Sequence, residues 1–288
     1  MRSGFISIFG RPNAGKSTLL NALIGEKLAI VSHKVQTTRH RIKGIITEKD
    51  YQIVISDTPG IIESKYKLHE KMMEVVKDSL EDADLAILLV DVKDDPKESD
   101  AIFTALKLKV PAIVVLNKID LADTNRIKEV TDYFKGRPYC RKLITISAAS
   151  GINRKKFIAS MLEFIPEGPV YFEGNDLSDL QTRFFVGELV REKIYEMAQD
   201  EIPYQTTVQV KEYKEKDSLV KITADIIVQR ETQKVILIGQ KGSMIKKIGT
   251  EARKSIEEFI GQKVFLELFV KVKPNWRENE LQLKDLGY

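Results

Sequence analysis

Residues 10–17 read GRPNAGKS, which matches the pattern G-x-x-x-x-G-K-[ST] in full. An apolar strand is expected at 5–9, and a helix is expected to begin at Ser17. A glycine-rich loop in that position turns backbone N–H groups toward phosphate oxygens, and the positive end of the helix faces the same point. Lys16 supplies an ammonium for the β- and γ-phosphates, and Ser17 supplies a hydroxyl for Mg²⁺. The stretch therefore predicts a P-loop nucleotide site that uses Mg²⁺.

Three further motifs follow in order: DTPG at 57–60, NKID at 117–120 and SAA at 147–149. Asp57 is expected to end a strand as a second magnesium ligand, and Gly60 to offer its N–H to the γ-phosphate. The carboxylate of Asp120 can accept from N1–H and the 2-amino group of guanine together, a pattern that adenine lacks. The four motifs together predict a switch that binds GTP and GDP.

Between the loop and Asp57 lies Gln36-Thr37-Thr38-Arg39-His40, where a hydroxyl is expected to complete the magnesium site when a γ-phosphate is present. We choose Thr38 over Thr37. The neighbouring Arg39, His40 and Arg41 are candidates for contact with phosphate or a partner, and a solvated basic loop is the alternative for them. The predicted catalytic residues are Lys16, Thr38 and Gly60, and the predicted metal ligands are Ser17, Thr38 and Asp57. The predicted nucleotide-binding residues are Gly10, Arg11, Pro12, Asn13, Ala14, Gly15, Lys16, Ser17, Thr18, Asp57, Thr58, Pro59, Gly60, Asn117, Lys118, Asp120, Ser147, Ala148 and Ala149.

Strand and helix patterns alternate through the first half, which predicts an α/β fold with a mostly parallel sheet and helices on both faces. Strands are expected at 5–9, 41–47, 52–56, 85–90, 112–116 and 143–146, with helices at 17–23, 67–80, 97–108, 124–135 and 153–164. We place the nucleotide-binding domain at 1–170, a linker at 171–178, and a smaller α+β domain at 179–288. In the second domain we expect helices at 182–198 and 243–259 and strands at 206–213, 219–230 and 264–272. Residues 232–238 are ambiguous between strand and helix, because Val and Ile favour strands.

Composition indicates an ordinary folded chain of 288 residues with 43% hydrophobic and 31% charged residues. The single cysteine, Cys140, excludes an internal disulfide. The first strand is expected near Gly4, so no signal peptide is expected, and the apolar runs are too short to cross a membrane. Net charge is +4, yet residues 239–254 hold five basic side chains against one acidic. This local basic region favours a nucleic-acid site, and a solvated helix face is the alternative.

Within that region, Gly239-Gln-Lys-Gly242 follows an apolar stretch and precedes a helix, as in the KH module that binds single-stranded nucleic acid. The predicted RNA-binding residues are Ile238, Gly239, Gln240, Lys241, Gly242, Ile245, Lys246, Lys247, Arg253 and Lys254. Ile236, Ile238, Ile245 and Ile248 are expected to form an apolar wall for unstacked bases. An ordinary helix–helix turn is the alternative. Trp276 could stack on a base or pack at an edge, and His33, His40 and His69 are read as surface or partner residues.

The motifs GRPNAGKS, QTTRH, DTPG, NKID and SAA resemble those of the translation-factor-related GTPases. Together with the second half, including the VKPNWRENE tail, the whole chain resembles the bacterial Era GTPase family. The resemblance implies a type II KH domain and binding of single-stranded ribosomal RNA near the 3′ end of 16S rRNA. It also implies a role in 30S subunit assembly, and a cytoplasmic, monomeric protein with weak peripheral association with the inner membrane.

One position departs from the Ras-like pattern, because Ile61 follows DTPG where those enzymes carry a water-orienting glutamine. Intrinsic hydrolysis is therefore expected to be slow. In some relatives the asparagine that matches Asn13 helps to bind K⁺, which the resemblance allows here. The main rival function is a signalling or membrane-associated switch whose second domain binds protein. A metabolic kinase is a third, which NKID argues against.

Overall fold

The computed structural model describes residues 1–174, 176–216 and 218–288, and the chain forms two compact units. The first unit comprises residues 1–29, 38–64 and 71–179, and the second comprises 30–37, 65–70 and 180–288. Two short segments that flank the nucleotide motifs in sequence, 30–37 and 65–70, thus belong to the unit built mainly from the second half of the chain. The domain boundaries at 170 and 178 stay a prediction.

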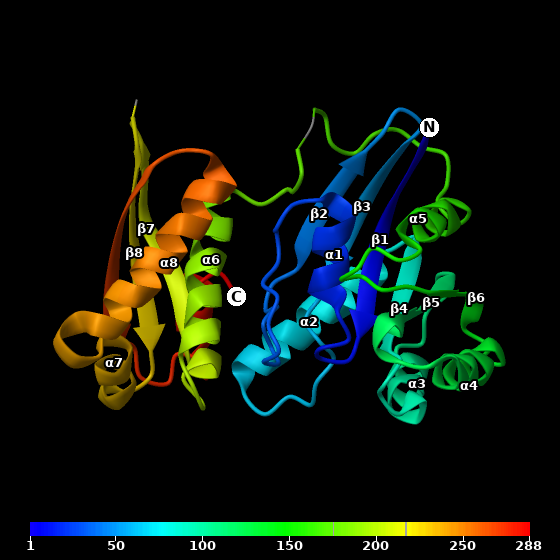
Figure 1. The fold of residues 1–288 in the computed structure, drawn as a ribbon, viewed down its shortest axis with the longest axis horizontal. Coiled ribbons are helices and arrows are strands. Elements are labelled where there is room, and N and C mark those ends of the chain that lie inside the picture. Colours follow the sequence, from blue (N-terminus) through cyan, green and yellow to red (C-terminus); the bar gives the residue numbers. More distant parts are fainter. Residues whose placement is uncertain (175, 217) are drawn as a thin grey trace. The chain divides into compact units, whose positions relative to one another are not determined.

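The first unit is built on a six-stranded sheet in the order β2-β3-β1-β4-β5-β6 (Figure 1). β2 pairs with β3 antiparallel and every other pair is parallel, so the predicted mostly parallel sheet is confirmed. Its strands are β1 (Arg2–Gly10), β2 (Ile42–Thr47), β3 (Tyr51–Asp57), β4 (Leu85–Asp91), β5 (Ala112–Asn117) and β6 (Cys140–Thr145). Parallel strands run in apolar stretches because helices cover both of their faces.

The helices of the first unit lie on both faces of this sheet. They are α1 (Lys16–Ile24), α2 (Lys67–Glu81), α3 (Pro96–Ala105), α4 (Thr124–Lys135) and α5 (Arg154–Leu162). Of α2, residues 71–81 belong to this unit and 67–70 to the second. α2, α3 and α4 bury Val76, Phe103 and Phe134 against Leu88 and its neighbours on one face. The alternate residues of β4, such as Ile87, are also fully buried, so the opposite face is covered too. Leu23 and Phe157 bring α1 and α5 together there.

This topology gathers the sequence motifs at one edge of the sheet. Gly10 ends β1, Asp57 ends β3 and Asn117 ends β5, and all three strands are parallel. Ser147 follows shortly after β6. The crevice beyond the carboxyl ends of parallel strands is where ligands bind in open α/β sheets.

The second unit packs helices on one three-stranded sheet in the order β7-β8-β9 (Figure 1). β7 and β8 are antiparallel, whereas β8 and β9 are parallel. α6 packs on β7 and against α8, and α8 packs on β9. The elements are α6 (Thr182–Met197), β7 (Thr207–Glu215), β8 (Val220–Val228), α7 (Glu231–Ile238), α8 (Ser243–Ile260), β9 (Val264–Val272) and α9 (Glu280–Asp285).

The ambiguous segment before GQKG is the helix α7. Its start is stabilised by Gln233, whose side-chain oxygen accepts from the backbone N–H groups of Gln229 and Arg230. Two orphan donors at the helix start are thereby satisfied, and the buried Leu237 ties the helix to the core. Tertiary burial and capping outweigh the strand preference of the Val and Ile side chains.

Two side chains that could have lain on the surface, those of Trp276 and His69, are buried. Trp276 is fully buried, donates its ring N–H to the carbonyl of Gln205 at 3.1 Å, and stacks on Tyr288. It therefore packs at the edge of the core and is not presented to a base. His69 is also buried, and its ring lies tilted against the ring of Tyr66 with centroids 3.7 Å apart, so the surface interpretation is wrong for this histidine.

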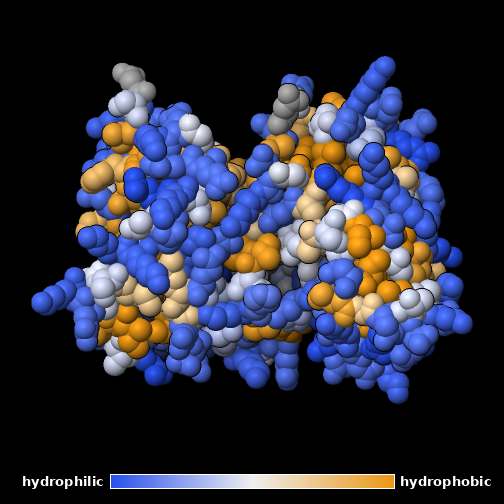
Figure 2. Space-filling model, viewed as in Figure 1, coloured by the Kyte–Doolittle hydropathy of each residue, from blue (hydrophilic) through white to orange (hydrophobic). Residues whose placement is uncertain are grey.

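The surface in Figure 2 is mostly hydrophilic, with small apolar patches. Across the described residues, no helix is both long and apolar enough to cross a membrane.

Candidate nucleotide and nucleic-acid sites

The phosphate loop is held in a conformation that only glycine fits at residue 15. Gly15 caps α1 with a φ of 99°, in the left-handed region that disfavours L side chains. A Cβ at this position would lie 2.3 Å from Nδ2 of Asn117. α1 has no acidic residue in its first turn, so nothing in that turn competes for the positive end of the helix. The loop and helix therefore present the N–H groups and dipole that a phosphate requires.

Lys16 is buried, and its ammonium folds back over the loop. Nζ donates to the carbonyls of Gly10 at 3.2 Å and Arg11 at 3.1 Å. Burial lowers the pKa of Lys16 to about 8, and the nearby Asp57 carboxylate opposes that shift. A buried ammonium with a depressed pKa is stabilised by an added anion, and phosphate oxygens are the anions that this motif binds.

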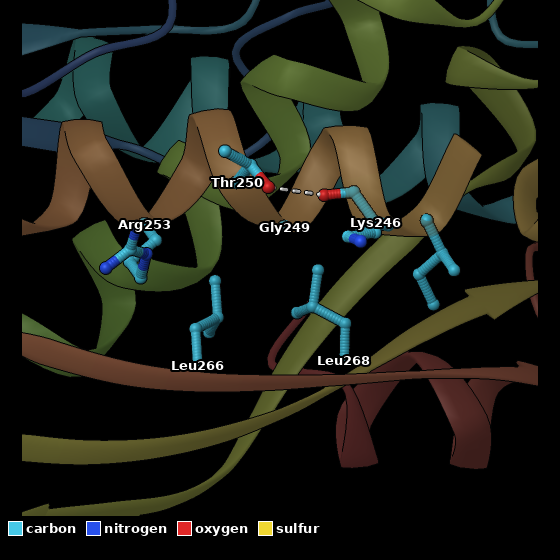
Figure 3. Close-up of a pocket in the computed structure, with 7 residues that line it drawn as sticks. Lys246, Gly249, Thr250, Arg253, Leu266 and Leu268 are labelled. Carbon is cyan, nitrogen blue, oxygen red and sulfur yellow. Dashed lines mark hydrogen bonds between the residues drawn. The ribbon is translucent and has the colours of Figure 1, made fainter. Parts of the chain in front are cut away.

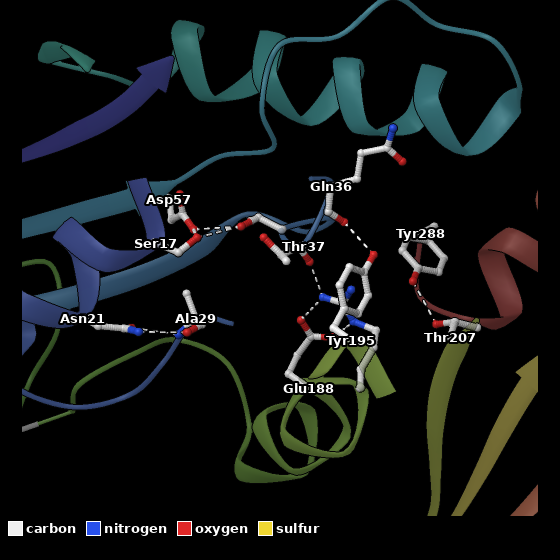
Figure 4. A network of polar contacts seen from close by, with 12 residues as sticks. Ser17, Asn21, Ala29, Gln36, Thr37, Asp57, Glu188, Tyr195, Thr207 and Tyr288 are labelled. Atoms are coloured by element: carbon white, nitrogen blue, oxygen red, sulfur yellow. Dashed lines mark hydrogen bonds and ion pairs between the residues drawn. The ribbon is translucent and has the colours of Figure 1, made fainter. Parts of the chain in front are cut away.

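Three oxygens meet where the predicted magnesium ion belongs (Figure 4). Ser17 Oγ lies 2.6 Å from Asp57 Oδ2, Thr38 Oγ1 lies 3.0 Å from the same oxygen, and the two hydroxyls are 2.9 Å apart. The other carboxylate oxygen, Asp57 Oδ1, is buried and has no hydrogen-bond partner among the residues that the structure describes. Burial raises the pKa of Asp57, although Lys16 and the two hydroxyls oppose the shift.

These residues fit a magnesium ion. A divalent cation would offset the desolvation of the Asp57 carboxylate, and Mg²⁺ prefers oxygen ligands from one or two carboxylates together with phosphates and water. Among the described residues, no group of three His, Cys, Asp or Glu gathers as an all-protein metal cage. Thr38 faces Ser17 and Asp57 with its hydroxyl, whereas Thr37 lies in the second unit.

The NKID motif joins the phosphate loop to the SAA segment through hydrogen bonds. Asn117 donates to the carbonyl of Ala14 at 2.9 Å and accepts from the N–H of Ala148 at 2.9 Å. Lys118 donates to the carbonyl of Asn13 at 2.8 Å. It also pairs with Asp91 at 2.7 Å, a partner at the end of β4 that no motif marked. The phosphate loop, the NKID segment and the SAA segment are therefore one hydrogen-bonded body, with the exposed Asp120 beside it.

The DTPG segment closes against the phosphate loop. Thr58 donates its hydroxyl to the carbonyl of Ile8 at 2.7 Å, which anchors the segment to β1. A Cβ on Gly60 would lie 3.0 to 3.1 Å from atoms of Pro12, so the backbone of Gly60 approaches the loop closely. Ile61 donates its N–H to the carbonyl of Gly10, and its side chain packs on the apolar cluster under α2. The side chain of Ile61 offers no hydrogen bond to water.

In the second unit, the GQKG loop exposes its two central side chains. Gly239 and Gly242 have φ angles of 72° and 78°, and Lys241 between them has 50°. A Cβ at Gly239 would come within 2.8 Å of Met244 N and Cβ, so a larger residue does not fit. Gln240 and Lys241 are exposed at the start of α8, which has no acidic residue in its first turn. The loop therefore offers a backbone surface and a cation to a phosphodiester chain.

Next to the loop, α8 and β9 border a groove of about 320 Å³ (Figure 3). Its basic side chains, Lys246 and Arg253, lie on α8, and its apolar side chains, Leu266 and Leu268, lie on β9. The remaining lining residues are Ile245, Gly249 and Thr250. Cations on one side and apolar side chains on the other suit an unstacked base attached to a phosphate.

The structure places the four isoleucines of the predicted apolar wall in different environments. Ile248 is fully buried in the core and Ile238 packs on that core, so of the four isoleucines expected there only Ile245 lines the groove. Leu266 and Leu268 are the other apolar side chains of the groove, and sequence reasoning missed them because they alternate along a strand like ordinary core residues. Lys247 and Lys254 are exposed on α8 but do not line the groove, and Ile236 is exposed on α7. Gly249 and Thr250 carried no motif signal.

Known families match both units. A family model described as 50S ribosome-binding GTPase matches residues 5–118, and one described as KH domain matches residues 201–277. Fold and site thus define the class of the protein, a P-loop GTPase domain followed by a KH domain.

Relatives match over the full length of the chain. GTPase Era of Geobacter metallireducens is 44% identical over 291 residues, which cover 100% of this chain and 98% of that protein. GTPase Era of Staphylococcus epidermidis is 42% identical over 290 residues, covering 100% and 97%. The chain therefore belongs to the GTPase Era family.

Two solved structures are similar over the whole chain, each with a TM-score of 0.95 and 37% identity, covering 100% of this chain and 99% of the other. One is an Aquifex aeolicus Era variant bound to GDP·AlF4⁻. The other is Era in complex with MgGDPNP and nucleotides 1506–1542 of 16S ribosomal RNA.

Proposed function

We propose that this chain binds GTP with Mg²⁺, hydrolyses it slowly, and uses the bound nucleotide to control binding of single-stranded ribosomal RNA. The observation that supports the proposal is the joint presence of the four nucleotide-binding motifs and a groove with basic side chains. They occur in a chain that is similar over its full length to Era in complex with MgGDPNP and 16S ribosomal RNA nucleotides. The RNA is taken to be the 3′ end of 16S rRNA, and the process to be assembly of the 30S subunit.

We assign nucleotide binding to the phosphate loop, the NKID segment and the SAA segment, which hydrogen bonds join to one another. The loop N–H groups and Lys16 hold the β- and γ-phosphates, and Asp120 reads N1–H and the 2-amino group of guanine. Ser17, Thr38 and Asp57 hold Mg²⁺, which neutralises the charge that develops on the phosphates during transfer. Gly60 offers its backbone N–H to the γ-phosphate, so the segment after it senses whether that phosphate is present.

We assign hydrolysis to the positioning of the phosphates and to the positive charge around them. A polar side chain at residue 61 takes no part, because that residue is Ile61. Ile61 is held by its backbone and packs on an apolar cluster, so Ile61→Ala should keep the turnover rate within a few-fold of the parent. Asn13, in the loop braced by Lys118, is proposed to help hold K⁺ near the phosphates. Replacing K⁺ by Na⁺ should then lower the parental rate but leave Asn13→Ala unaffected. Equal parental rates in the two salts would remove potassium from the account.

RNA binding is assigned to the GQKG loop and the groove between α8 and β9. Lys241, Lys246 and Arg253 contact phosphates, while Leu266 and Leu268 contact an unstacked base. Gly249 offers a sharp test, because its Cβ position lies 3.5 Å from Leu268 Cδ1 at the groove wall. Gly249→Ala should be tolerated, whereas Gly249→Leu should fill the groove and weaken RNA binding. A parental RNA affinity in Gly249→Leu would move the base site elsewhere.

The chain is further proposed to be a cytoplasmic monomer with weak peripheral association with the inner membrane. The rival function, a signalling or membrane-associated switch whose second domain binds protein, is separated by one titration. The full chain is titrated with a 16S 3′-end oligonucleotide, a scrambled RNA of equal length, and anionic phospholipid vesicles at a single salt concentration. The proposal expects the oligonucleotide to bind most tightly. Stronger binding to vesicles, or none to either RNA, would favour the rival.

A further inference from the structure

One face of α6 contacts the segment 34–37, which belongs to the same compact unit. Glu188, Arg191 and Tyr195 are spaced three and four residues apart, so they lie on one face of the helix. Figure 4 shows Glu188 and Tyr195 beside Gln36 and Thr37. The contacts within this unit are polar and specific.

Consecutive backbone carbonyls of the segment accept hydrogen bonds from α6. The hydroxyl of Tyr195 donates to the carbonyl of Gln36 at 3.0 Å, and Nη2 of Arg191 donates to the carbonyl of Thr37. In the reverse direction, Lys34 donates to the carbonyls of Tyr195 at 2.6 Å and Ala198 at 2.5 Å. Carbonyls at a helix C-terminus lack intrahelical partners and attract cations, so Lys34 completes the end of α6.

Burial makes these contacts specific. Arg191 and Tyr195 are each 1% exposed, so water does not offer their donors an easy alternative. Glu188 fixes the guanidinium of Arg191 with two hydrogen bonds, Nε to Oε1 at 2.8 Å and Nη2 to Oε2 at 2.6 Å. A buried ion pair of this kind is weak evidence for stability, because desolvation offsets much of its attraction. A role in aiming the Arg191 donor at Thr37 accounts for the pair.

The segment adopts a conformation that its own residues disfavour. Gln36 has a φ of 59°, in the left-handed region that non-glycine residues rarely occupy. Such conformations persist where surrounding contacts over-determine them, and they cluster at switch regions. Gln36 is also held through its side chain, whose Oε1 lies 3.2 Å from Nε2 of His69. The conformation of 34–37 is therefore set by its contacts rather than by local preference.

The chain crosses from the second unit to the first at the peptide bond between Thr37 and Thr38. The carbonyl of Thr37 and the Cα of Thr38 belong to one rigid peptide plane. A hydrogen bond that fixes this carbonyl therefore restricts where the Thr38 side chain can point. Thr38 places its hydroxyl against Ser17 and Asp57.

We propose that Arg191 and Tyr195 are positioning residues for the magnesium ligand Thr38, and that α6 thereby selects the GTP-bound state. The inference rests on the proposed function, in which Thr38 contacts Mg²⁺ only when the γ-phosphate is present. Anchoring of 34–37 favours the conformation that recognises GTP and leaves GDP binding unaffected. By thermodynamic linkage, anything that displaces α6 from the segment 34–37 lowers the affinity for GTP and leaves the affinity for GDP unchanged.

The test uses the full chain with Tyr195→Phe, which deletes one hydroxyl, and Arg191→Lys, which keeps the charge beside Glu188 but loses the planar fork. Tyr213→Phe on β7, outside these contacts, is the matched control. Affinities for a non-hydrolysable GTP analogue and for GDP are measured across a Mg²⁺ titration. Each α6 variant should weaken the analogue at least fivefold and shift its Mg²⁺ midpoint upward, with GDP affinity unchanged. RNA affinity of the nucleotide-free variants should stay parental, which verifies that the unit is folded.

A second arm places Tyr195→Phe in a Thr38→Ala background. If Tyr195 acts through Thr38, the second substitution should have no further effect, as a double-mutant cycle detects. Parental analogue affinity in both α6 variants would overturn the inference, and so would an effect of Tyr195→Phe that persists without the Thr38 hydroxyl. A silent Thr38→Ala would instead contradict the metal assignment in the proposed function, so the two failures are distinguishable.

Discussion

The two glycine loops of this chain share a local geometry but differ in their surroundings. Each ends on a left-handed glycine, Gly15 or Gly242, that caps a helix without an acidic first turn. Lys16 in the first loop is buried, whereas Lys241 in the second is exposed. In the proposed function, the same loop geometry therefore binds a compact phosphate group where its lysine is buried and a polymer where its lysine is exposed. Enclosure, rather than loop sequence, is what distinguishes a chemical site from a docking site.

The largest effects should come from the enclosed loop. Lys16→Ala removes the cation at the β- and γ-phosphates, and Ser17→Ala removes a magnesium ligand. Each should lower the GTP turnover rate by roughly 10²-fold or more, the range for losing one preorganised charge-stabilising group. Ser17→Ala should also raise the Mg²⁺ concentration that turnover requires. Lys77→Ala, an exposed lysine on α2, is the control in the same phosphate-release assay. Parental turnover in both loop variants would contradict the site.

Substitutions in the exposed Gly239–Gly242 loop should lower the affinity for RNA and leave the affinity for GTP unchanged. Replacing Gln240 and Lys241 together by Asp puts two carboxylates against the RNA backbone, which should abolish RNA binding and leave GTP affinity parental. Lys241→Asp alone can be compared with Lys211→Asp, an exposed lysine on β7 that undergoes the same change of charge. Losing one phosphate contact should reduce the slope of log affinity against log salt by about 0.7 for Lys241→Asp. Equal slopes for the two variants would show that only net charge matters.

The third prediction concerns recognition of the guanine base by Asp120. Asp120→Asn replaces two acceptors by one acceptor and one donor pair. It should weaken GTP by roughly 5–150-fold, the equivalent of about 1–3 kcal/mol for a bidentate contact. Affinity for xanthosine triphosphate should rise, because its base has a carbonyl where guanine has the amine. An unchanged preference for GTP in a competition titration would remove Asp120 from the base pocket.

A smaller effect should follow from the buried charge of Lys16. The pKa of Lys16 is lowered from 10.5 to about 8 in the free protein, while a bound phosphate favours the charged form. Above pH 8, binding must therefore take up a proton, so GTP affinity should fall roughly tenfold between pH 7 and pH 9. Lys16→Met, measured by the same titration, controls for ionisation of the guanine base. An equal fall in that variant would contradict the assignment.

The nucleotide half was readable from sequence because each motif specifies both its conformation and its chemistry. Gly15 must be glycine for its φ, and Asp57 ends a buried strand that an apolar pattern marks in the sequence. Most helices and strands were predicted within a few residues, since helical and strand periodicities differ. The bracing role of Asn117 was not predicted, because a base-recognition motif does not reveal that its asparagine joins two other loops.

The remainder depends on packing between residues far apart in sequence. Leu266 and Leu268 look like any inward strand residues, and only the position of α8 leaves them beside a groove. The anchor formed by Arg191 and Tyr195 is invisible in sequence, because an amphipathic helix pattern does not say which loop it will meet. Trp276 is ambiguous for the same reason, since its burial depends on Gln205 and Tyr288.

The central claim is that the enclosed site and the open surface are coupled, and the affinity of the full chain for the 16S 3′-end oligonucleotide in its two nucleotide states tests it most directly. Measured at one fixed salt concentration, that affinity should differ between the GTP-analogue and GDP forms by roughly 5–150-fold, the usual range of coupling. RNA should in turn tighten the favoured nucleotide by the same factor, because coupling is reciprocal. Equal RNA affinity in the two nucleotide states would contradict the switch and leave two independent binding sites on one chain.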